Sequence, residues 1–197
     1  MKKIILRYAF ATFFATLLLF AMSFFQISYA HAQEVSQSAT ESAKVKIVEY
    51  DLAYPGILPD HFLYKLKVLR DKATVFLIND PRKKADYYLL QADKGILATA
   101  MLIDQNKIDL AQETVLKAEH NYTLLTYELK KIPKKPDAKY FQKLKTASLK
   151  HQEVLNSLIK RIPEDKQKVF TQVLEFSKRN LTTVELYQRE RQKEEIE

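Results

Sequence analysis

Three histidines could carry metal or acid–base chemistry in the body of this chain: His61, His120 and His151. A metal half-site on a helix needs a second ligand three or four residues away. Those positions around each histidine hold no His, Cys, Asp or Glu. The spacing therefore predicts no metal site within one helix and leaves open a site assembled from different helices. His151 falls on an apolar stripe, which favours a core imidazole with satisfied hydrogen bonds.

Nucleophilic and carboxylate chemistry have equally little support. The chain has no cysteine and no Gly-x-Ser-x-Gly segment. Asp109 and Glu113 lie one helical turn apart, but on a face that we expect to be solvated, where nothing would raise the pKa of a carboxyl group. The sequence therefore predicts a protein that is not an enzyme, with no cofactor and no small-molecule substrate.

The N-terminus has the layout of a secretory signal. Three basic residues precede an uncharged apolar run over residues 8–25, and small residues follow at Ala30 and Ala32. We expect residues 1–32 to be a signal peptide cut after Ala32, or after Ala30; the alternative is an uncleaved anchor, because about 18 apolar residues can just span a bilayer. Both place the remainder outside the cytoplasm, secreted or held at the outer face of the membrane.

The remaining residues predict an all-α fold, a bundle of about five helices. The whole chain has only two glycines, which argues against hairpin-rich β folds. Residues 33–48 are polar and Ser-rich, as in a short flexible stalk. A helical domain follows over 49–132, and a C-terminal helical hairpin over 133–197 packs on the same bundle. Apolar residues repeat at spacings of three and four within expected helices at 60–78, 81–105, 107–132, 137–162 and 163–187.

The segment just before the first helix combines turn-forming residues. Pro55 and Gly56 suit a type II turn, and Asp60 could cap the helix that follows. Two successive turns would bring an extended arm onto the bundle; the functional alternative is a recognition loop. The candidate residues are Tyr54, Pro55, Gly56, Pro59, Asp60 and His61.

Two sets of charged residues are candidates for specific contacts. The first set could form an ion network between the first two helices, or remain five solvated charges: Arg70, Asp71, Asp86, Asp93 and Lys94. The second lies within 130–150, where eight lysines face a single Asp, and its spacing of four, four and seven puts it on one helix face: Lys135, Lys139, Lys143 and Lys150.

Several of these motifs together resemble a known family. They are Tyr54-Pro55-Gly56, Leu58-Pro59-Asp60, Leu63-Tyr64-Lys65-Leu66-Lys67, Arg70-Asp71, Asp80-Pro81-Arg82-Lys83-Lys84-Ala85 and Leu90-Gln91-Ala92-Asp93-Lys94. The chain is similar over about residues 50–129 to an uncharacterised bacterial family of exported or envelope-anchored helical domains, described as a domain of unknown function. The resemblance implies an extracytoplasmic helical domain, as found in anchored and anti-sigma-like envelope proteins. Phe62 and Gly95 depart from the family pattern.

Two functions remain open. The first is a non-enzymatic structural or protein-interaction module of the bacterial envelope, whose partner is an unknown envelope protein. The second is a module that binds an anionic wall polymer, lipid head groups or extracellular nucleic acid through the Lys-rich face, with an affinity that falls steeply with salt.

Overall fold

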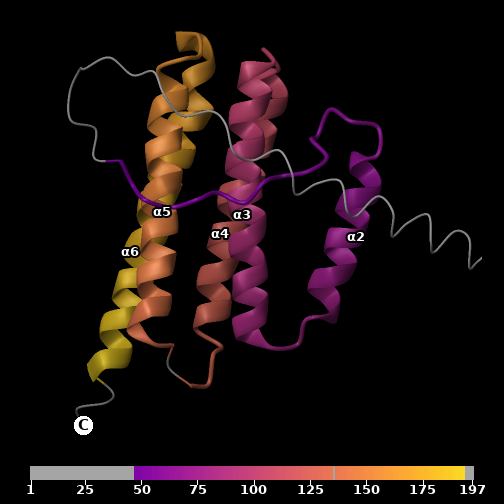
Figure 1. Ribbon diagram of the computed structural model, residues 1–197. Coiled ribbons are helices and arrows are strands. Elements are labelled where there is room, and N and C mark those ends of the chain that lie inside the picture. The colour runs from indigo at the N-terminus through magenta and orange to yellow at the C-terminus, as the bar shows by residue number, and fades with distance from the viewer. Residues whose placement is uncertain (1–46, 135, 194–197) are drawn as a thin grey trace, which may run out of the picture. The chain divides into compact units, whose positions relative to one another are not determined.

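The structure is a computed structural model that describes residues 47–134 and 136–193. The predicted signal peptide and residues 33–46 of the predicted stalk lie outside the described residues. The described part is helical and contains no strand, which confirms the predicted all-α class. Figure 1 shows the helices, which are α2 (Tyr64–Leu77), α3 (Pro81–Asp104), α4 (Ile108–Leu129), α5 (Ala138–Ile159) and α6 (Gln167–Lys193), with the 3₁₀ turn η2 (Glu164–Lys166) before α6.

Two of the helix starts follow the capping residues that the sequence predicts. The Asp80 carboxylate accepts a hydrogen bond from the Lys83 backbone N–H at 2.9 Å, with Pro81 at the first helical position. The Asp137 carboxylate accepts from the Tyr140 N–H at 2.7 Å. The predicted start of the first helix at Asp60 is wrong, because residues before Tyr64 form turns and the Asp60 carboxylate pairs with Lys107 at 2.5 Å.

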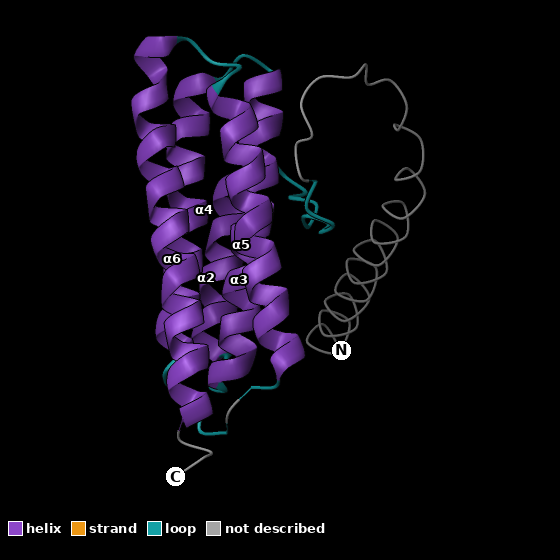
Figure 2. Ribbon diagram, turned by 90° about the vertical axis from the view of Figure 1, so that its left-hand side faces the viewer, coloured by secondary structure: helices purple, strands orange, loops and turns teal. Residues whose placement is uncertain are grey.

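Helices α3 to α6 form a four-helix bundle. Helix α3 packs on α4 and α5, and α6 packs on the other side of the same two helices, so α4 and α5 face each other across the bundle axis. Figure 2 shows the four helices running alongside one another. The alternating spacing of three and four predicted for 107–132 is confirmed, because its apolar positions from Ala111 to Ile132 are buried.

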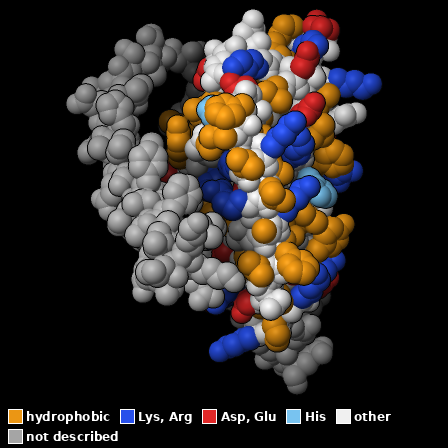
Figure 3. Space-filling view, turned by 90° about the vertical axis from the view of Figure 1, so that its right-hand side faces the viewer, with side chains coloured by type: hydrophobic (Ala, Val, Ile, Leu, Met, Phe, Trp, Pro, Cys, Tyr) orange, Lys and Arg blue, Asp and Glu red, His pale blue; other side chains and the backbone are white. Residues whose placement is uncertain are grey.

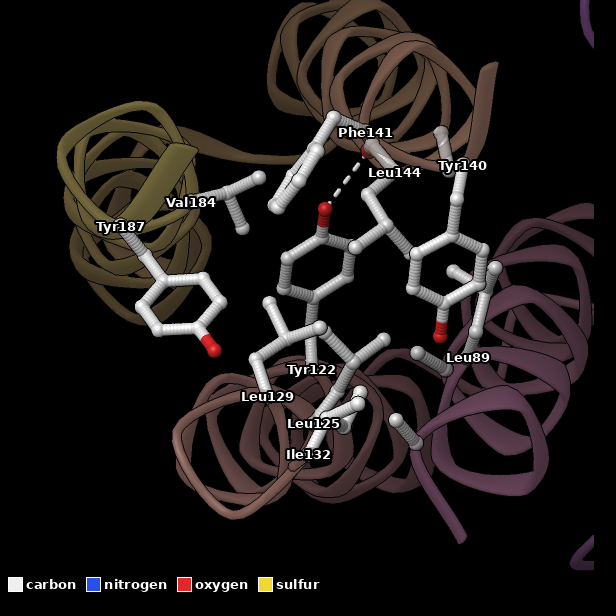
Figure 4. Close-up of a cluster of buried hydrophobic side chains, with 13 residues drawn as sticks. Leu89, Tyr122, Leu125, Leu129, Ile132, Tyr140, Phe141, Leu144, Val184 and Tyr187 are labelled. Carbon is white, nitrogen blue, oxygen red and sulfur yellow. Dashed lines mark hydrogen bonds between the residues drawn. The ribbon is translucent and has the colours of Figure 1, made fainter. Parts of the chain in front are cut away.

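Aromatic and aliphatic side chains fill one half of the bundle core. Figure 4 shows Tyr122 of α4 pointing across the axis, where its hydroxyl donates to the Leu144 carbonyl of α5 at 2.6 Å. Phe141 of α5 and Tyr187 of α6 pack with ring centroids 6.1 Å apart. A second cluster, centred on Ile96, Leu155 and Phe170, fills the other half.

Gly95 marks the closest approach of α3 to α4. A Cβ atom built on Gly95 would lie 2.6 Å from the Ala118 Cβ and 3.0 Å from its Cα. The second atom belongs to the backbone and cannot move aside cheaply. The structure thus gives a physical reason for a glycine in the middle of this helix.

We therefore expect Gly95→Ala to destabilise the protein, although alanine is the better helix former by about 1 kcal/mol. Overpacking at a helix contact costs about 1–3 kcal/mol, so a net loss should appear in urea unfolding. Ala118→Gly should partly restore the stability of Gly95→Ala, because it removes the opposing Cβ. If the changes in unfolding free energy of the two substitutions were simply additive in the double variant, this explanation would be wrong.

Helix α2 lies beside the bundle rather than in it. Figure 1 shows α2 to one side of the other helices; it has no buried residue, and the large side chains of its apolar stripe are exposed. The sequence places Leu66, Leu69 and Phe76 on that stripe, and a stripe of this kind normally faces a core. In this helix the inward side instead carries Tyr64, whose side chain is half-buried, and the Asp71 backbone.

Residues 47–53 form an extended arm across the bundle. Val48, Tyr50 and Leu52 turn toward the helices, while the alternate residues between them are exposed, as the period of two in an extended chain requires. The Val48 N–H donates to the Glu153 carboxylate of α5 at 2.7 Å. The extended arm that the sequence predicts is thus present over residues 47–53, and residues 47 and 48, predicted as the end of the stalk, belong to this arm.

Candidate functional site

The strongest chemical feature of the described residues is a charged group buried in the bundle axis. His151 of α5 is fully buried, and each of its ring nitrogens meets a different carboxylate. Its Nε2 lies 2.9 Å from Asp93 Oδ1 on α3, and its Nδ1 lies 3.2 Å from Glu119 Oε1 on α4. Both acids are themselves buried, with 5% and 2% of their surface exposed.

Two further side chains extend this group to the arm and to α6. The Tyr50 hydroxyl donates to Asp93 Oδ2 at 2.7 Å, and the Asn180 amide donates to Glu119 Oε2 at 3.1 Å. We call Tyr50, Asp93, Glu119, His151 and Asn180 the axial network. It joins the arm and all four bundle helices through one residue from each.

The geometry favours the doubly protonated form of His151. A neutral imidazole has one N–H and could donate to only one of the two carboxylates, whereas an imidazolium donates to both. Burial lowers the pKa of His151, but its hydrogen bonds to Asp93 and Glu119 and their negative charges outweigh burial and raise that pKa from 6.5 to about 9. His151 is therefore a buried cation at neutral pH.

The neighbouring tyrosines remain hydrogen-bond donors. Burial and the hydrogen bond to Asp93 raise the pKa of Tyr50. Burial and the nearby Glu119 likewise raise the pKa of Tyr122, whose ring meets that of His151 edge-on with centroids 5.6 Å apart. A neutral hydroxyl beside Asp93 adds a hydrogen bond without adding negative charge.

This arrangement suits a structural role better than catalysis. Both nitrogens of His151 are engaged, and the ring has no exposed surface that a substrate could reach. Within the described residues no group of three His, Cys, Asp or Glu side chains has the geometry of a metal site. Two surface pockets contain no residue of the axial network: one lies at the Asp80 end of α3, and a small one lies between α2, α3 and α4.

The candidate ion network of the first two helices is split by the structure. Arg70 pairs with its neighbour Asp71 on the surface at 2.7 Å, and Asp86 pairs with Lys143 of α5 at 3.3 Å. Asp93 belongs to the axial network, so these residues do not form one cluster. Lys94 instead lines the small pocket between α2, α3 and α4.

The Lys-rich face is partly neutralised by ion pairs. Lys143 contacts Asp86, and Lys150, only 20% exposed, contacts Glu153 at 2.7 Å. Lys139 is exposed, and Lys135 lies outside the described residues. Salt-sensitive binding of an anionic polymer to this face stays a prediction, and the geometry does not favour it.

The predicted turn residues lie together at the start of α2. Gly56 has φ of +68°, a left-handed value that suits glycine, and Pro55 is buried. Tyr54 is two-thirds exposed, and Asp60 is tied to Lys107. His61 Nδ1 accepts from the Leu63 N–H at 3.1 Å, and its ring stacks on Phe62. Pro59 lines the small pocket near Tyr64. Most of these contacts are local, which supports the structural interpretation of the segment.

Sequence reasoning missed three members of the axial network. Glu119 directly follows Ala118, which lies on the apolar stripe of α4. Its position beside that stripe is the only sequence signal that could have suggested a buried acid. Tyr50 and Asn180 lie far from His151 along the chain, and no spacing rule connects them to it. The interpretation of His151 as a core imidazole with satisfied hydrogen bonds agrees with the structure.

None of the described helices is both long enough and apolar enough to cross a bilayer. The apolar run at 8–25 lies outside the described residues, so its role as signal or anchor stays a prediction.

Comparison with known proteins finds a family model that matches the chain. No curated protein and no solved structure matches the chain. A family model described as a domain of unknown function (DUF5667) matches residues 56–165, more than half of the 197 residues. The match begins after the arm and ends at the turn before α6, so it includes Asp93, Glu119 and His151 but neither Tyr50 nor Asn180. The chain belongs to this DUF5667 family.

Proposed function

We propose that the protein is a non-enzymatic module of the bacterial envelope, with a structural or protein-interacting role outside the cytoplasm. The observation that carries the proposal is the attachment of the arm to the bundle axis. The arm directly follows the N-terminal segment in the chain, and its Tyr50 bonds to a carboxylate that also holds His151. These contacts hold the bundle rigidly to the arm, and thus close to the leader or stalk that precedes it.

The polar residues of the bundle support the same proposal. The buried ionisable groups near the axis contact one another across different helices. Their hydrogen bonds therefore fix the helices relative to one another. Exposed acids such as Asp109 and Glu113 are paired with Lys166 and Lys117. Because these polar groups already have partners within the protein, binding to another protein would use the outer surface of the bundle and leave its core unchanged.

The attachment of the arm can be tested with Tyr50→Phe. The substitution keeps the ring and removes one hydrogen bond to a buried carboxylate, so we expect a loss of about 1.5–3 kcal/mol in unfolding free energy. Limited proteolysis should then cut residues 47–58 faster. Tyr54→Phe is the matched control, because that side chain on the same segment is two-thirds exposed. Equal behaviour of the two variants would show that the arm is not held through Asp93.

The envelope role needs an experiment in the producing cells. The full-length chain would carry a photo-crosslinking residue at one of three exposed positions, namely Leu116 on α4, Leu149 on α5 or Leu186 on α6. We expect recovery of the chain in the envelope fraction, with one reproducible crosslinked protein from one position and none from the others. Recovery in the cytosol, or no crosslinked protein from any position, would contradict the proposal.

A further inference from the structure

Helix α2 carries an apolar stripe that faces solvent. At 100° per residue its members lie within an arc of about 100°. Each large side chain is between 62% and 84% exposed, and Figure 3 looks onto this side of the protein, where hydrophobic side chains run the length of the surface. On the helix the stripe consists of Leu66, Leu69, Ala73, Phe76 and Leu77, and Phe62 lies in the turn just before the first helical residue.

Basic residues border the stripe. Lys65 and Lys72 lie along one edge and Arg70 along the other. Helix α2 itself holds four Lys or Arg against one Asp. That acid, Asp71, pairs with Arg70, so it does not offset Lys65 and Lys72 at the edge. The surface is therefore both apolar and positively charged.

The inward side of α2 is the more polar one. Lys67 bonds to the Ile57 carbonyl at 3.3 Å and lies over the Tyr64 ring, and the Tyr87 hydroxyl of α3 donates to the Asp71 carbonyl at 3.2 Å. These contacts hold α2 beside α3 with its hydrophobic side outward. The stripe is thus left free of the protein's own core.

We infer that α2 lies on an anionic lipid surface, with its apolar stripe in the interface and Lys65 and Lys72 against the head groups. A large apolar face bordered by Lys and Arg is the pattern of an interfacial helix. A second copy of the chain fits less well. Two such stripes packed together would bring Lys65 and Lys72 of each copy close to those of the other, without acids to compensate them.

The preceding chain agrees with this occupant. The apolar run ends at Phe25, and residues 26–46 separate it from the first described residue. Fully extended, these residues span at most about 75 Å. With the run in a bilayer, the tether would keep α2 at a high local concentration near lipid. Only this tether argument rests on the proposed envelope location. The cell fractionation experiment and the lipid-binding experiment therefore test the two proposals independently.

The absence of cysteine from the chain permits a clean test. Ala73→Cys puts one environment-sensitive dye in the middle of the stripe without removing a large side chain, and Ser157→Cys puts the same dye on an exposed position of α5. The full-length chain is reconstituted with vesicles of phosphatidylglycerol and phosphatidylcholine, or of phosphatidylcholine alone. Emission, and quenching by a lipid-borne quencher, report whether the dye enters the interface.

Dye at position 73 should shift to the blue and be quenched, more strongly with phosphatidylglycerol, while dye at 157 should remain in water. Leu66→Gln, Leu69→Gln and Phe76→Gln together should weaken the response at least about tenfold and leave the melting temperature unchanged. The matched control changes Leu116, Leu149 and Leu186 to Gln, and it should keep the response. Dye 73 staying in water with both vesicles, an unchanged response in the α2 variant, or burial that follows protein concentration rather than lipid would each overturn the inference.

Discussion

Replacing His151 with Leu should lower the free energy of unfolding by about 3–5 kcal/mol. Leucine has a similar volume, so the loss does not come from a cavity. It comes from Asp93 and Glu119, which would stay buried on opposite sides of an apolar side chain without the cation that both now contact. Chemical denaturation followed by circular dichroism would measure the change.

His120→Leu is the matched control, because His120 lies on α4 with its side chain exposed. Surface substitutions of this kind usually change stability by less than about 0.5 kcal/mol. A His151→Leu variant that loses no more stability than His120→Leu would show that the two acids tolerate the missing cation, and that the axial network is not a unit.

The bundle could be predicted because its information is local. Periodic apolar positions on α3, α4 and α5 identify the buried faces, and Asp80 and Asp137 mark two helix starts through hydrogen bonds to residues three positions later. These signals need no knowledge of how the helices meet.

The axial network could not be predicted in the same way. His151 and Asp93 are 58 residues apart, and Glu119 and Asn180 are 61 residues apart. Their contacts exist only because α3 packs beside α5 and α4 packs beside α6, and the order of the helices in space is not encoded in any one helix. From the sequence, Asp93 is therefore predicted in a different cluster, with charges of the first two helices.

Helix α2 shows a different limit. Its stripe has the period of a core-facing helix, and periodicity shows which residues share a face but not what that face meets. In the structure the face meets solvent, because the bundle is already closed by four other helices. The apolar residues of α2, whose period suggests packing in the core, are the residues on which the proposal of lipid binding rests.

The axial network also gives the bundle a pH dependence with a defined sign. Asp93 and Glu119 face the ring of His151 from α3 and α4, Tyr122 meets its edge, and Tyr50 and Asn180 bond to the two acids. The folded-state pKa of His151 is about 9, above the value of 6.5 for an unfolded chain. A raised pKa means that the folded state holds the proton more tightly than the unfolded state does.

Stability from this proton should thus be fully present below pH 6.5 and lost as pH rises through 9, by a total of about 3 kcal/mol. Urea unfolding between pH 6 and pH 9.5 should show a steady decline that flattens in His151→Leu. A neutral His151 ring could donate to only one of the two carboxylates, so the network resists loss of the second ring proton. NMR of the His151 ring should therefore give a protonation midpoint near pH 9. A midpoint at or below 6.5, or unfolding free energies that stay level across this range, would mean that the ring is neutral in the folded protein and that one of its two acids carries the proton instead.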